Sequence, residues 1–379
     1  MRIGIDYTAA VRQQAGIGRY TRSLIGALAR LDQTNDYVLF SAGRDPAAHE
    51  WPPNFGTRSV PLSDRHMSAI WHKLRIPLPI EWITGPLDLF HSPDFVLPPV
   101  RRARTVLTIH DLSFLRHPEC SSPSLLSYLM RAVPPSLARA DLILADSEST
   151  RRDLVELLSV DPSRIRVIYP AVDPTFRPSD AACVQGVREL YAIGEQSYIL
   201  SVGTLQPRKN YVRLLQAFAQ IRRDSGLPHH LVIAGGPGWL YEPIYQAIQD
   251  LALGDSVHLL GYVDEGDLPA LYTGAELFAF PSLYEGFGFP VLEAMACGTP
   301  VVSADSSSLP EAAGQAALLV PPTDTMALAE AMGRVLSESH TRAELIRRGY
   351  LQCRRFRWED AARSLLTSYI ETLNGETHV

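Results

Sequence analysis

The sequence predicts an α/β protein that consists of two doubly wound, Rossmann-like domains. The chain has 379 residues, 46% of them hydrophobic, and this length exceeds what one hydrophobic core usually serves. Short apolar runs rich in β-branched residues alternate with helical patterns along the chain. Because the runs are continuously apolar, we expect parallel strands that are covered by helices on both faces.

Twelve such runs are expected to form strands, six in each half of the chain. In the first half they span residues 2–6, 37–43, 88–93, 104–111, 142–147 and 166–172. In the second half they span residues 198–203, 230–236, 256–263, 277–282, 300–305 and 316–322. The helical patterns between them supply the crossovers that a parallel sheet requires.

The domain boundary is expected within residues 171–180, where prolines and aspartates interrupt any periodic pattern. This division predicts an N-terminal domain at 1–173 and a C-terminal domain at 174–355. The last stretch, 356–379, has apolar residues at helical spacing, and we expect a terminal helix that packs back on the first domain. A hinge at the boundary would place a cleft between the domains.

Composition excludes several classes of protein. A net charge of −6 argues against a nucleic-acid partner, which would normally require a basic face. The four cysteines form no C-x-x-C pair, so neither a zinc cage nor a disulfide framework is predicted. The start of the chain has no signal-peptide pattern, and no apolar run is long enough to span a membrane. These features favour a cytoplasmic protein.

The segment 65–82 mixes aromatic, aliphatic and basic residues and has two interpretations. It could lie on a membrane surface as an amphipathic helix. It could instead be a core helix that precedes the strand at 88–93, and we favour this second interpretation.

The strongest chemical signal follows the expected strand at 277–282. Ligands of open α/β sheets bind beyond the carboxyl ends of the strands. Gly286 and Gly288 let the backbone approach a ligand, and Pro290 suits the first turn of a helix whose N–H groups attract anions. Glu285 lies on this loop, and Glu293 is expected in the first helical turn. A phosphate between these carboxylates would leave both as acceptors for hydroxyl groups, although Glu293 could simply stabilise the helix dipole.

A second loop, after the expected strand at 198–203, carries Arg208 and Lys209. Lys209 is one of only two lysines in the chain. No D-x-D pair occurs in the sequence, so the usual acidic holder of a metal that would neutralise a diphosphate is missing. The adjacent cations can replace that metal, although a solvated charge pair is the alternative interpretation.

The first domain offers weaker signals. Gly16 and Gly18 resemble a truncated phosphate loop, but a plain tight turn explains them equally well. His110 closes the expected strand at 104–111, where a histidine either faces a ligand or is a satisfied structural residue. Ser308 and Glu311 are expected to form a capping box at the start of a helix.

Together these motifs resemble the GT-B glycosyltransferases, specifically the retaining family 4 that includes bacterial mannosyltransferases of polysaccharide and O-antigen assembly. The resemblance covers the whole chain, from GIGRY through HDLSFLRHPE and SVGTLQPRKN to YEGFGFPVLEAMACGTPVVSA. It implies GT-B architecture, in which two Rossmann-like domains face each other across a cleft.

The resemblance also implies roles for individual residues. Glu285 and His110 would contact the donor sugar, and Glu293 would bind the ribose. Arg208 and Lys209 would bind the diphosphate. Gly16 and Gly18 would lie near the phosphate and the acceptor. The backbone of Gly286, Phe287, Gly288 and Phe289 would surround the diphosphate, and the backbone at Tyr262 and Val263 would hold the base.

The expected function is therefore metal-independent transfer of a hexose, with retention, from a nucleotide diphosphate sugar to a saccharide or lipid-linked saccharide. GDP-mannose is the favoured donor, no other cofactor is implied, and a UDP-sugar is the alternative. A lipid-linked acceptor would add peripheral association with the inner face of the membrane. A nucleotide-sugar epimerase and a non-catalytic sugar-nucleotide sensor also remain open. A dehydrogenase is disfavoured because AGIGRY lacks the third glycine of the dinucleotide motif.

Overall fold

The computed structural model describes residues 1–13, 16–43, 50–74 and 76–375, which form two compact units. The first unit comprises Met1–Leu115, Pro123–Pro170 and Trp358–Val379. The second comprises Ala171–Arg357 together with the short segment Arg116–Ser122, which belongs to it although its sequence lies within the first half of the chain.

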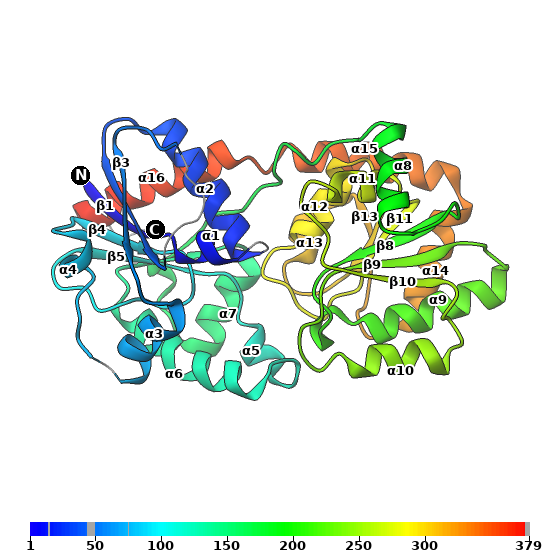
Figure 1. The fold of residues 1–379 in the computed structure, drawn as a ribbon, viewed down its shortest axis with the longest axis horizontal. Coiled ribbons are helices and arrows are strands. Elements are labelled where there is room, and N and C mark those ends of the chain that lie inside the picture. Colours follow the sequence, from blue (N-terminus) through cyan, green and yellow to red (C-terminus); the bar gives the residue numbers. More distant parts are fainter. Residues whose placement is uncertain (14–15, 44–49, 75, 376–379) are drawn as a thin grey trace. The chain divides into compact units, whose positions relative to one another are not determined.

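The first unit contains a seven-stranded parallel sheet with strand order β3-β2-β1-β4-β5-β6-β7 (Figure 1). Its strands are β1 (Arg2–Asp6), β2 (Asp36–Ala42), β3 (Phe55–Val60), β4 (Leu89–Ser92), β5 (Arg104–Ile109), β6 (Leu142–Ala145) and β7 (Ile165–Val167). The order reverses between β1 and β4, which is the topological switch point of a doubly wound sheet.

Helices cover both faces of this sheet (Figure 1). They are α1 (Thr8–Arg12), α2 (Ile17–Leu31), α3 (Asp64–Ser68), α4 (Glu81–Thr84), α5 (Ser113–Arg116), α6 (Pro123–Arg139), α7 (Glu148–Leu158) and α16 (Trp358–Asn374). Helix α16 buries Leu365 and Tyr369, and the Tyr369 hydroxyl shares a 2.7 Å hydrogen bond with Nδ1 of the buried His91 on β4. This contact makes the last helix part of the first unit.

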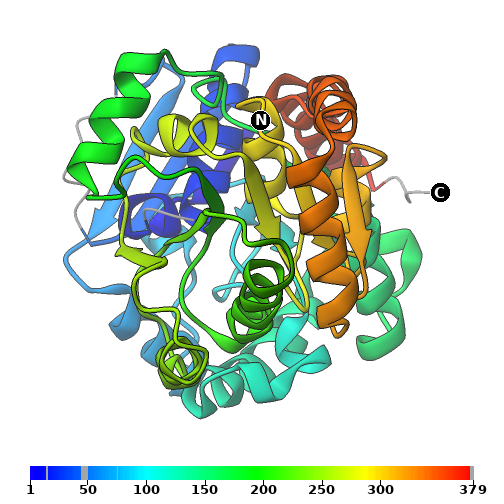
Figure 2. The same cartoon turned by 90° about the vertical axis from the view of Figure 1, so that its right-hand side faces the viewer.

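The second unit contains a six-stranded parallel sheet with strand order β10-β9-β8-β11-β12-β13. Its strands are β8 (Tyr198–Val202), β9 (His230–Ala234), β10 (Val257–Gly261), β11 (Leu277–Phe280), β12 (Val301–Ala304) and β13 (Ala317–Val320). Its helices are α8 (Ala181–Leu190), α9 (Tyr211–Ser225), α10 (Glu242–Asp250), α11 (Leu268–Thr273), α12 (Phe289–Ala296), α13 (Leu309–Ala313), α14 (Thr325–Ser337) and α15 (Ser339–Cys353). Figure 2 shows this sheet between its two layers of helices.

Each of the twelve expected strands corresponds to a strand of the two sheets, and the doubly wound fold class is confirmed. Strand β3 was not predicted, because its central residues are exposed at the edge of the sheet and carry little apolar signal. The strand expected at 166–172 ends at Val167. Pro170 cannot donate a ladder hydrogen bond, and only three residues pair with β6.

The segment 65–82 does not form the continuous core helix that we favoured. Helix α3 passes into a single π-helical turn, η1 (Ala69–Lys73), and Pro77 and Pro79 follow before α4 begins. The segment buries Met67 and Trp71 but exposes Leu74, Ile76 and Trp82. Proline removes the backbone donor that a continuing helix needs. Within the described ranges, no helix combines the length and apolar character needed to cross a membrane.

Candidate functional site

The charged residues predicted in the second domain meet at the switch point of the second sheet. Strands β8 and β11 are neighbours there, and the loops that follow them leave the same edge. The first loop contains the 3-10 turn η4 (Pro207–Lys209), and the second carries Glu285. This is the position at which doubly wound sheets bind ligands.

One carboxylate binds both predicted cations. Arg208 Nη1 donates to Glu285 Oε2, and Lys209 Nζ donates to Glu285 Oε1, each over 2.7 Å. Arg208 Nη1 also donates to the carbonyl oxygen of Tyr284 over 2.6 Å. The side chains of Lys209 and Glu285 are each only 10% exposed, so two positive groups and one negative group share a poorly solvated space. Taken by themselves, these three side chains carry a net positive charge.

The electrostatics of Glu285 reflect this arrangement. Burial alone would raise the pKa of its carboxyl, but Arg208 and Lys209 lower that pKa to about 2. Lys209 Nζ also lies 4.8 Å from the centre of the Phe280 ring, where the aromatic face attracts a cation. Glu285 is therefore ionised, and its carboxylate holds both cations in place.

Two serines that follow β12 fix the Glu285 loop. The Glu285 N–H donates to Ser307 Oγ over 2.8 Å. Ser308 Oγ donates to the carbonyl oxygens of Glu285 and Phe287 over 2.8 and 2.9 Å. The capping box predicted for Ser308 and Glu311 is wrong, because the Ser308 side chain makes no cap bond to α13. It supports the candidate site instead.

The start of α12 has the features expected of an anion-binding site. Gly288 precedes the helix with φ of 117°, a conformation that residues with a side chain rarely adopt. Phe289 and Pro290 are the first two helical residues, and the first N–H groups of a helix lack carbonyl partners within that helix. Gly286 is partly exposed, whereas the Phe287 ring is buried and packs 5.2 Å from the ring of Phe356. Phe287 can therefore offer a ligand its backbone only.

The expectation for Glu293 requires a correction. It is the fifth residue of α12 and lies beyond the first turn, so it does not serve the helix dipole there. Its carboxylate is 1% exposed, and Oε2 accepts a 2.8 Å hydrogen bond from the Tyr272 hydroxyl. In the predicted base-binding turn after β10, Tyr262 is 59% exposed and Val263 is buried.

In the first unit, both ring nitrogens of the buried His110 lie against acceptors. Nδ1 is 2.7 Å from Asp146 Oδ2, and Nε2 is 2.8 Å from the carbonyl oxygen of Pro93. Burial alone would lower the pKa of His110, but Asp146 raises it to about 9. A histidine with two acceptors donates from both nitrogens, so His110 is an imidazolium. This geometry matches the satisfied structural histidine that was our alternative interpretation.

The two glycines at the start of α2, Gly16 before the helix and Gly18 within its first turn, have different environments. Gly16 is the residue before the helix, with φ of 57°, and is exposed to open space. A Cβ atom on Gly18 would lie 2.0 Å from the carbonyl oxygen of Gln13, so only glycine fits at this close approach of two backbone segments. The packing explains Gly18, and Gly16 is the residue available to a ligand.

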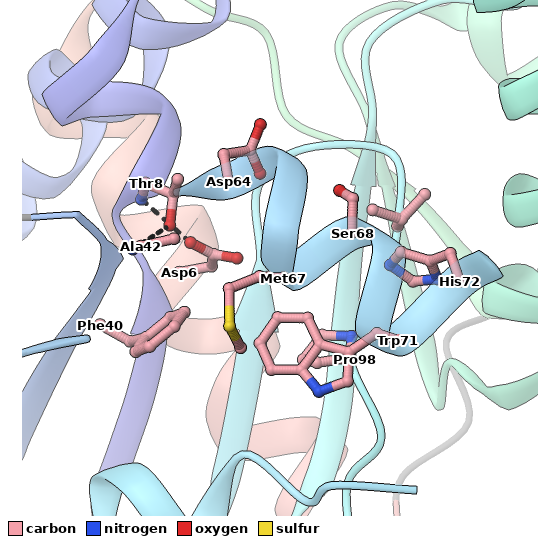
Figure 3. A pocket seen from close by; sticks show the side chains of 11 residues that line it. Asp6, Thr8, Phe40, Ala42, Asp64, Met67, Ser68, Trp71, His72 and Pro98 are labelled. Carbon is pink, nitrogen blue, oxygen red and sulfur yellow. Dashed lines mark hydrogen bonds between the residues drawn. The ribbon is translucent and has the colours of Figure 1, made fainter. Parts of the chain in front are cut away.

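A small cavity lies at the carboxyl end of β1 in the same unit. Figure 3 shows Asp6 beside Thr8, with Met67 and Trp71 also lining the cavity. Its volume is about 30 Å³, room for one or two water molecules. Asp64 and His72 also line it. Burial raises the pKa of Asp6 to about 6.

Comparison with known proteins finds matches over almost the whole chain. The family model "Glycosyltransferase Family 4" matches residues 15–176, and "Glycosyl transferases group 1" matches residues 188–352. The O-antigen chain mannosyltransferase B of Escherichia coli is 31% identical over 367 residues, which cover 93% of this chain and 95% of that protein. The chain belongs to the group 1, family 4 glycosyltransferases.

Two further proteins are similar to this glycosyltransferase, one in sequence and one in fold. A D-inositol 3-phosphate glycosyltransferase of Salinispora tropica is 36% identical over 251 residues, 62% of this chain and 52% of that protein. The sucrose-phosphate synthase structure from Thermosynechococcus elongatus has a TM-score of 0.77 at 23% identity and covers 99% of this chain and 100% of that one. The predicted family, the GT-B fold and the enzyme class of hexosyltransferase are confirmed.

Several residues contact the predicted site residues in ways that sequence reasoning missed. Asp146 binds His110, Tyr272 binds Glu293, and Ser307 and Ser308 hold the Glu285 loop. Asp146 directly follows β6 and both serines follow β12, so their places at strand ends were a usable signal. Tyr272 lies within α11, and only the packing of the fold reveals its contact.

Proposed function

We propose that this glycosyltransferase moves mannose from GDP-mannose to a saccharide or lipid-linked saccharide, with retention and without a metal in the transfer step. The single observation that carries the proposal is the Arg208–Lys209–Glu285 cluster. It concentrates positive charge at the edge of the sheet where a nucleotide diphosphate sugar would bind.

In this proposal the donor diphosphate takes the place of Glu285 as the partner of the two cations. Arg208 and Lys209 then stabilise the negative charge that develops on the departing diphosphate, and the N–H groups at the start of α12 add to that field. Glu285, released from its ion pairs, accepts hydrogen bonds from hydroxyls of the transferred sugar. Glu293 is assigned to the ribose, for which its carboxylate would have to exchange the Tyr272 hydroxyl for a ribose hydroxyl.

The bond changes are those of a substitution at the anomeric carbon. The bond from that carbon to the diphosphate oxygen breaks, and a bond to the acceptor oxygen forms on the same face. The departing phosphate oxygen takes the proton of the acceptor hydroxyl, so the reaction requires no protein nucleophile. This mechanism gives Glu285 a binding role.

The acceptor is assigned to the first unit. The exposure of Gly16, which the resemblance places near the acceptor, supports this assignment. Leu74, Ile76 and Trp82 expose apolar surface on the segment after η1, which supports a peripheral membrane contact for a lipid-linked acceptor.

Mannose is chosen because a relative whose match covers 93% of this chain is named as a mannosyltransferase. A UDP-sugar is the alternative donor, and a non-catalytic nucleotide-sugar-binding protein is a further one. Thermal unfolding with nucleotides separates the two donors, and an assay of transfer and donor hydrolysis separates the enzyme from the binding protein.

The test is thermal unfolding of the whole chain with GDP, UDP, GDP-mannose and UDP-glucose, each with EDTA present. A selective rise with GDP and GDP-mannose is expected, since a ligand at about 100 times its Kd adds roughly 2.7 kcal/mol to the free energy of unfolding. The double variant Arg208→Ala/Lys209→Ala should lose this rise. Lys73→Ala, which removes an exposed lysine in the other unit, should keep it.

The other outcomes are equally informative. A rise with UDP compounds alone would replace the proposed donor but keep the site. Stabilisation by GDP-mannose without transfer or donor hydrolysis would favour the binding protein. No rise with any nucleotide would overturn the proposed site.

A further inference from the structure

A second cluster of chemically reactive side chains lies in the segment Arg116–Ser122. It contains His117, Glu119 and Cys120, and one potential ligand atom from each lies within 4.8 Å of those of the other two. His117 Nδ1 is 3.1 Å from Glu119 Oε1, and Cys120 Sγ is 3.9 Å from the same oxygen. The residues proposed to bind the donor are not part of this cluster.

The local backbone explains why these side chains meet. Pro118–Cys120 form the 3-10 turn η2, and the Cys120 N–H donates to the His117 carbonyl oxygen over 2.9 Å. The ligand atoms of His117 and Cys120 lie within 4.8 Å of each other, so both side chains are on the same side of the turn. Trp239 Nε1 donates to the Cys120 carbonyl oxygen over 2.6 Å and anchors the turn to the second unit.

The spacing of the three atoms suits a small divalent cation. Zinc binds sulfur at about 2.3 Å and nitrogen or oxygen at about 2.0–2.2 Å, so tetrahedral ligands are roughly 3.3–3.6 Å apart. The two distances to Glu119 Oε1 lie on either side of this range, and Glu119 is exposed and free to adjust. A thiolate, an imidazole and a carboxylate form a donor set that favours Zn²⁺ over Mg²⁺ or Ca²⁺.

We propose that His117, Glu119 and Cys120 bind one thiophilic divalent cation, with Zn²⁺ as the best fit and a solvent molecule as the fourth ligand. His117 would bind through Nδ1. The Cys120 thiol would release its proton to solvent, and the resulting thiolate together with the Glu119 carboxylate would offset both charges of the ion.

The chemistry of the individual groups is compatible with this assignment. Burial raises the pKa of the Cys120 thiol to about 11, and the proximity of Glu119 adds to the increase, so the sulfur is protonated until a metal displaces the proton. A backbone hydrogen bond lowers the pKa of Glu119, and His117 lowers it further, so this carboxylate is ionised and ready to bind.

The site adjoins the proposed donor loop. The His117 ring lies 6.1 Å from the ring of Tyr284, edge to face, and Tyr284 directly precedes Glu285. A bound ion would therefore hold the 116–122 turn rigid against the loop of Glu285, the residue that binds Arg208 and Lys209. It would act on the position of that loop and would not take part in the transfer step.

The test is a Co²⁺ titration of the reduced, metal-free full-length protein, followed by near-ultraviolet absorption. One equivalent of Co²⁺ should give a thiolate-to-cobalt charge-transfer band, and Zn²⁺ should displace it. Cys120→Ser should abolish the band. His117→Gln and Glu119→Gln should weaken binding by more than the roughly 10–100-fold that loss of an outer-shell partner costs.

Cys183→Ser is the matched control, because Cys183 is exposed on α8 and should leave the band unchanged. The absence of a band in the unaltered protein would overturn the proposal, as would a band that survives Cys120→Ser or disappears with Cys183→Ser. If Cys120→Ser does not fold, His117→Gln decides, since its ring is partly exposed and unchanged Co²⁺ affinity in this variant also overturns the site. None of these readouts depends on the proposed transfer activity.

Discussion

At the scale of single residues, Glu285 and Glu344 show how burial changes what an ion pair contributes to stability. Each carboxylate binds two basic side chains, Arg208 and Lys209 for Glu285, and Arg347 and Arg348 for Glu344. Glu344 lies on the surface of α15, where water screens its partners. Glu285 is almost fully enclosed, so its loss would remove a negative charge that lies beside two cations in a poorly solvated space.

We therefore expect Glu285→Gln to lower the free energy of unfolding by about 3 kcal/mol, since glutamine keeps the size but removes the charge. GDP should restore part of this stability, because its diphosphate supplies the missing negative charge. Urea denaturation with and without GDP measures both effects.

Glu344→Gln is the control, and its effect should be small with or without GDP. Equal stability of Glu285→Gln and the unaltered protein would show that the buried ion pairs contribute nothing net. If GDP stabilised all three proteins equally, the result would contradict binding of the diphosphate by Arg208 and Lys209.

At the scale of elements, the site depends on how helix α12 begins. Its eight residues follow a loop whose last member, Gly288, has φ of 117° and ψ of 47°. Gly288 in this conformation joins the Glu285 loop to the helix. A Cβ atom on Gly288 would also lie 2.9 Å from Leu309 Cδ2, although that flexible side chain can move. Backbone conformation is therefore the main reason for glycine here.

We expect Gly288→Ala to destabilise the protein by roughly 1–3 kcal/mol, the usual cost of a residue held in a sparsely populated conformation. It should also weaken GDP binding, because relief of the strain would rotate the first N–H groups of α12. Denaturant unfolding and calorimetric titration with GDP measure the two effects.

Gly333→Ala is the matched control, since Gly333 lies within α14 with open space around its Cβ position. Alanine there should be neutral or stabilising by up to about 1 kcal/mol. Normal GDP affinity in Gly288→Ala would contradict a role for the helix start in binding.

At the scale of the whole molecule, the two units should respond to pH in opposite directions. In the first unit, the raised pKa of His110 stabilises the fold fully below its unfolded value near 6.5, and this contribution is lost as pH rises through about 9. Burial also raises the pKa values of Asp6 and Asp94 to about 6, so their contribution likewise declines as pH rises. In the second unit, Glu285 contributes above its unfolded pKa near 4.3, and its contribution is lost as pH falls towards 2.

We expect the unaltered protein to lose on the order of 2–3 kcal/mol of stability between pH 6.5 and pH 9.5 through His110. His110→Gln should be less stable at pH 6.5 and should show a flatter profile over this range. Urea denaturation at intervals of pH measures the profile. An equally steep decline in His110→Gln would mean that another group titrates.

The extent of prediction differed between the fold and the site. Twelve strands followed from continuous apolar runs, because burial in a parallel sheet imposes that pattern on any sequence. The edge strand β3 was not predicted, because its exposed residues need not be apolar and form no continuous apolar run. Arg208, Lys209 and Glu285 were found because strand ends converge at one sheet edge, whereas the bond of Ser308 to the Glu285 loop could not be found, since its sequence fits a helix cap equally well.

The sequence by itself determined the doubly wound fold, the family and the charged residues at the strand ends, since all three depend on local pattern and spacing. Only the tertiary structure decided what each charge binds. It paired Glu285 with two cations, placed Glu293 against Tyr272, and gave His110 two acceptors. The physical reason is that burial determines how strongly a charge interacts with its partners, and burial depends on residues that are far apart in the chain.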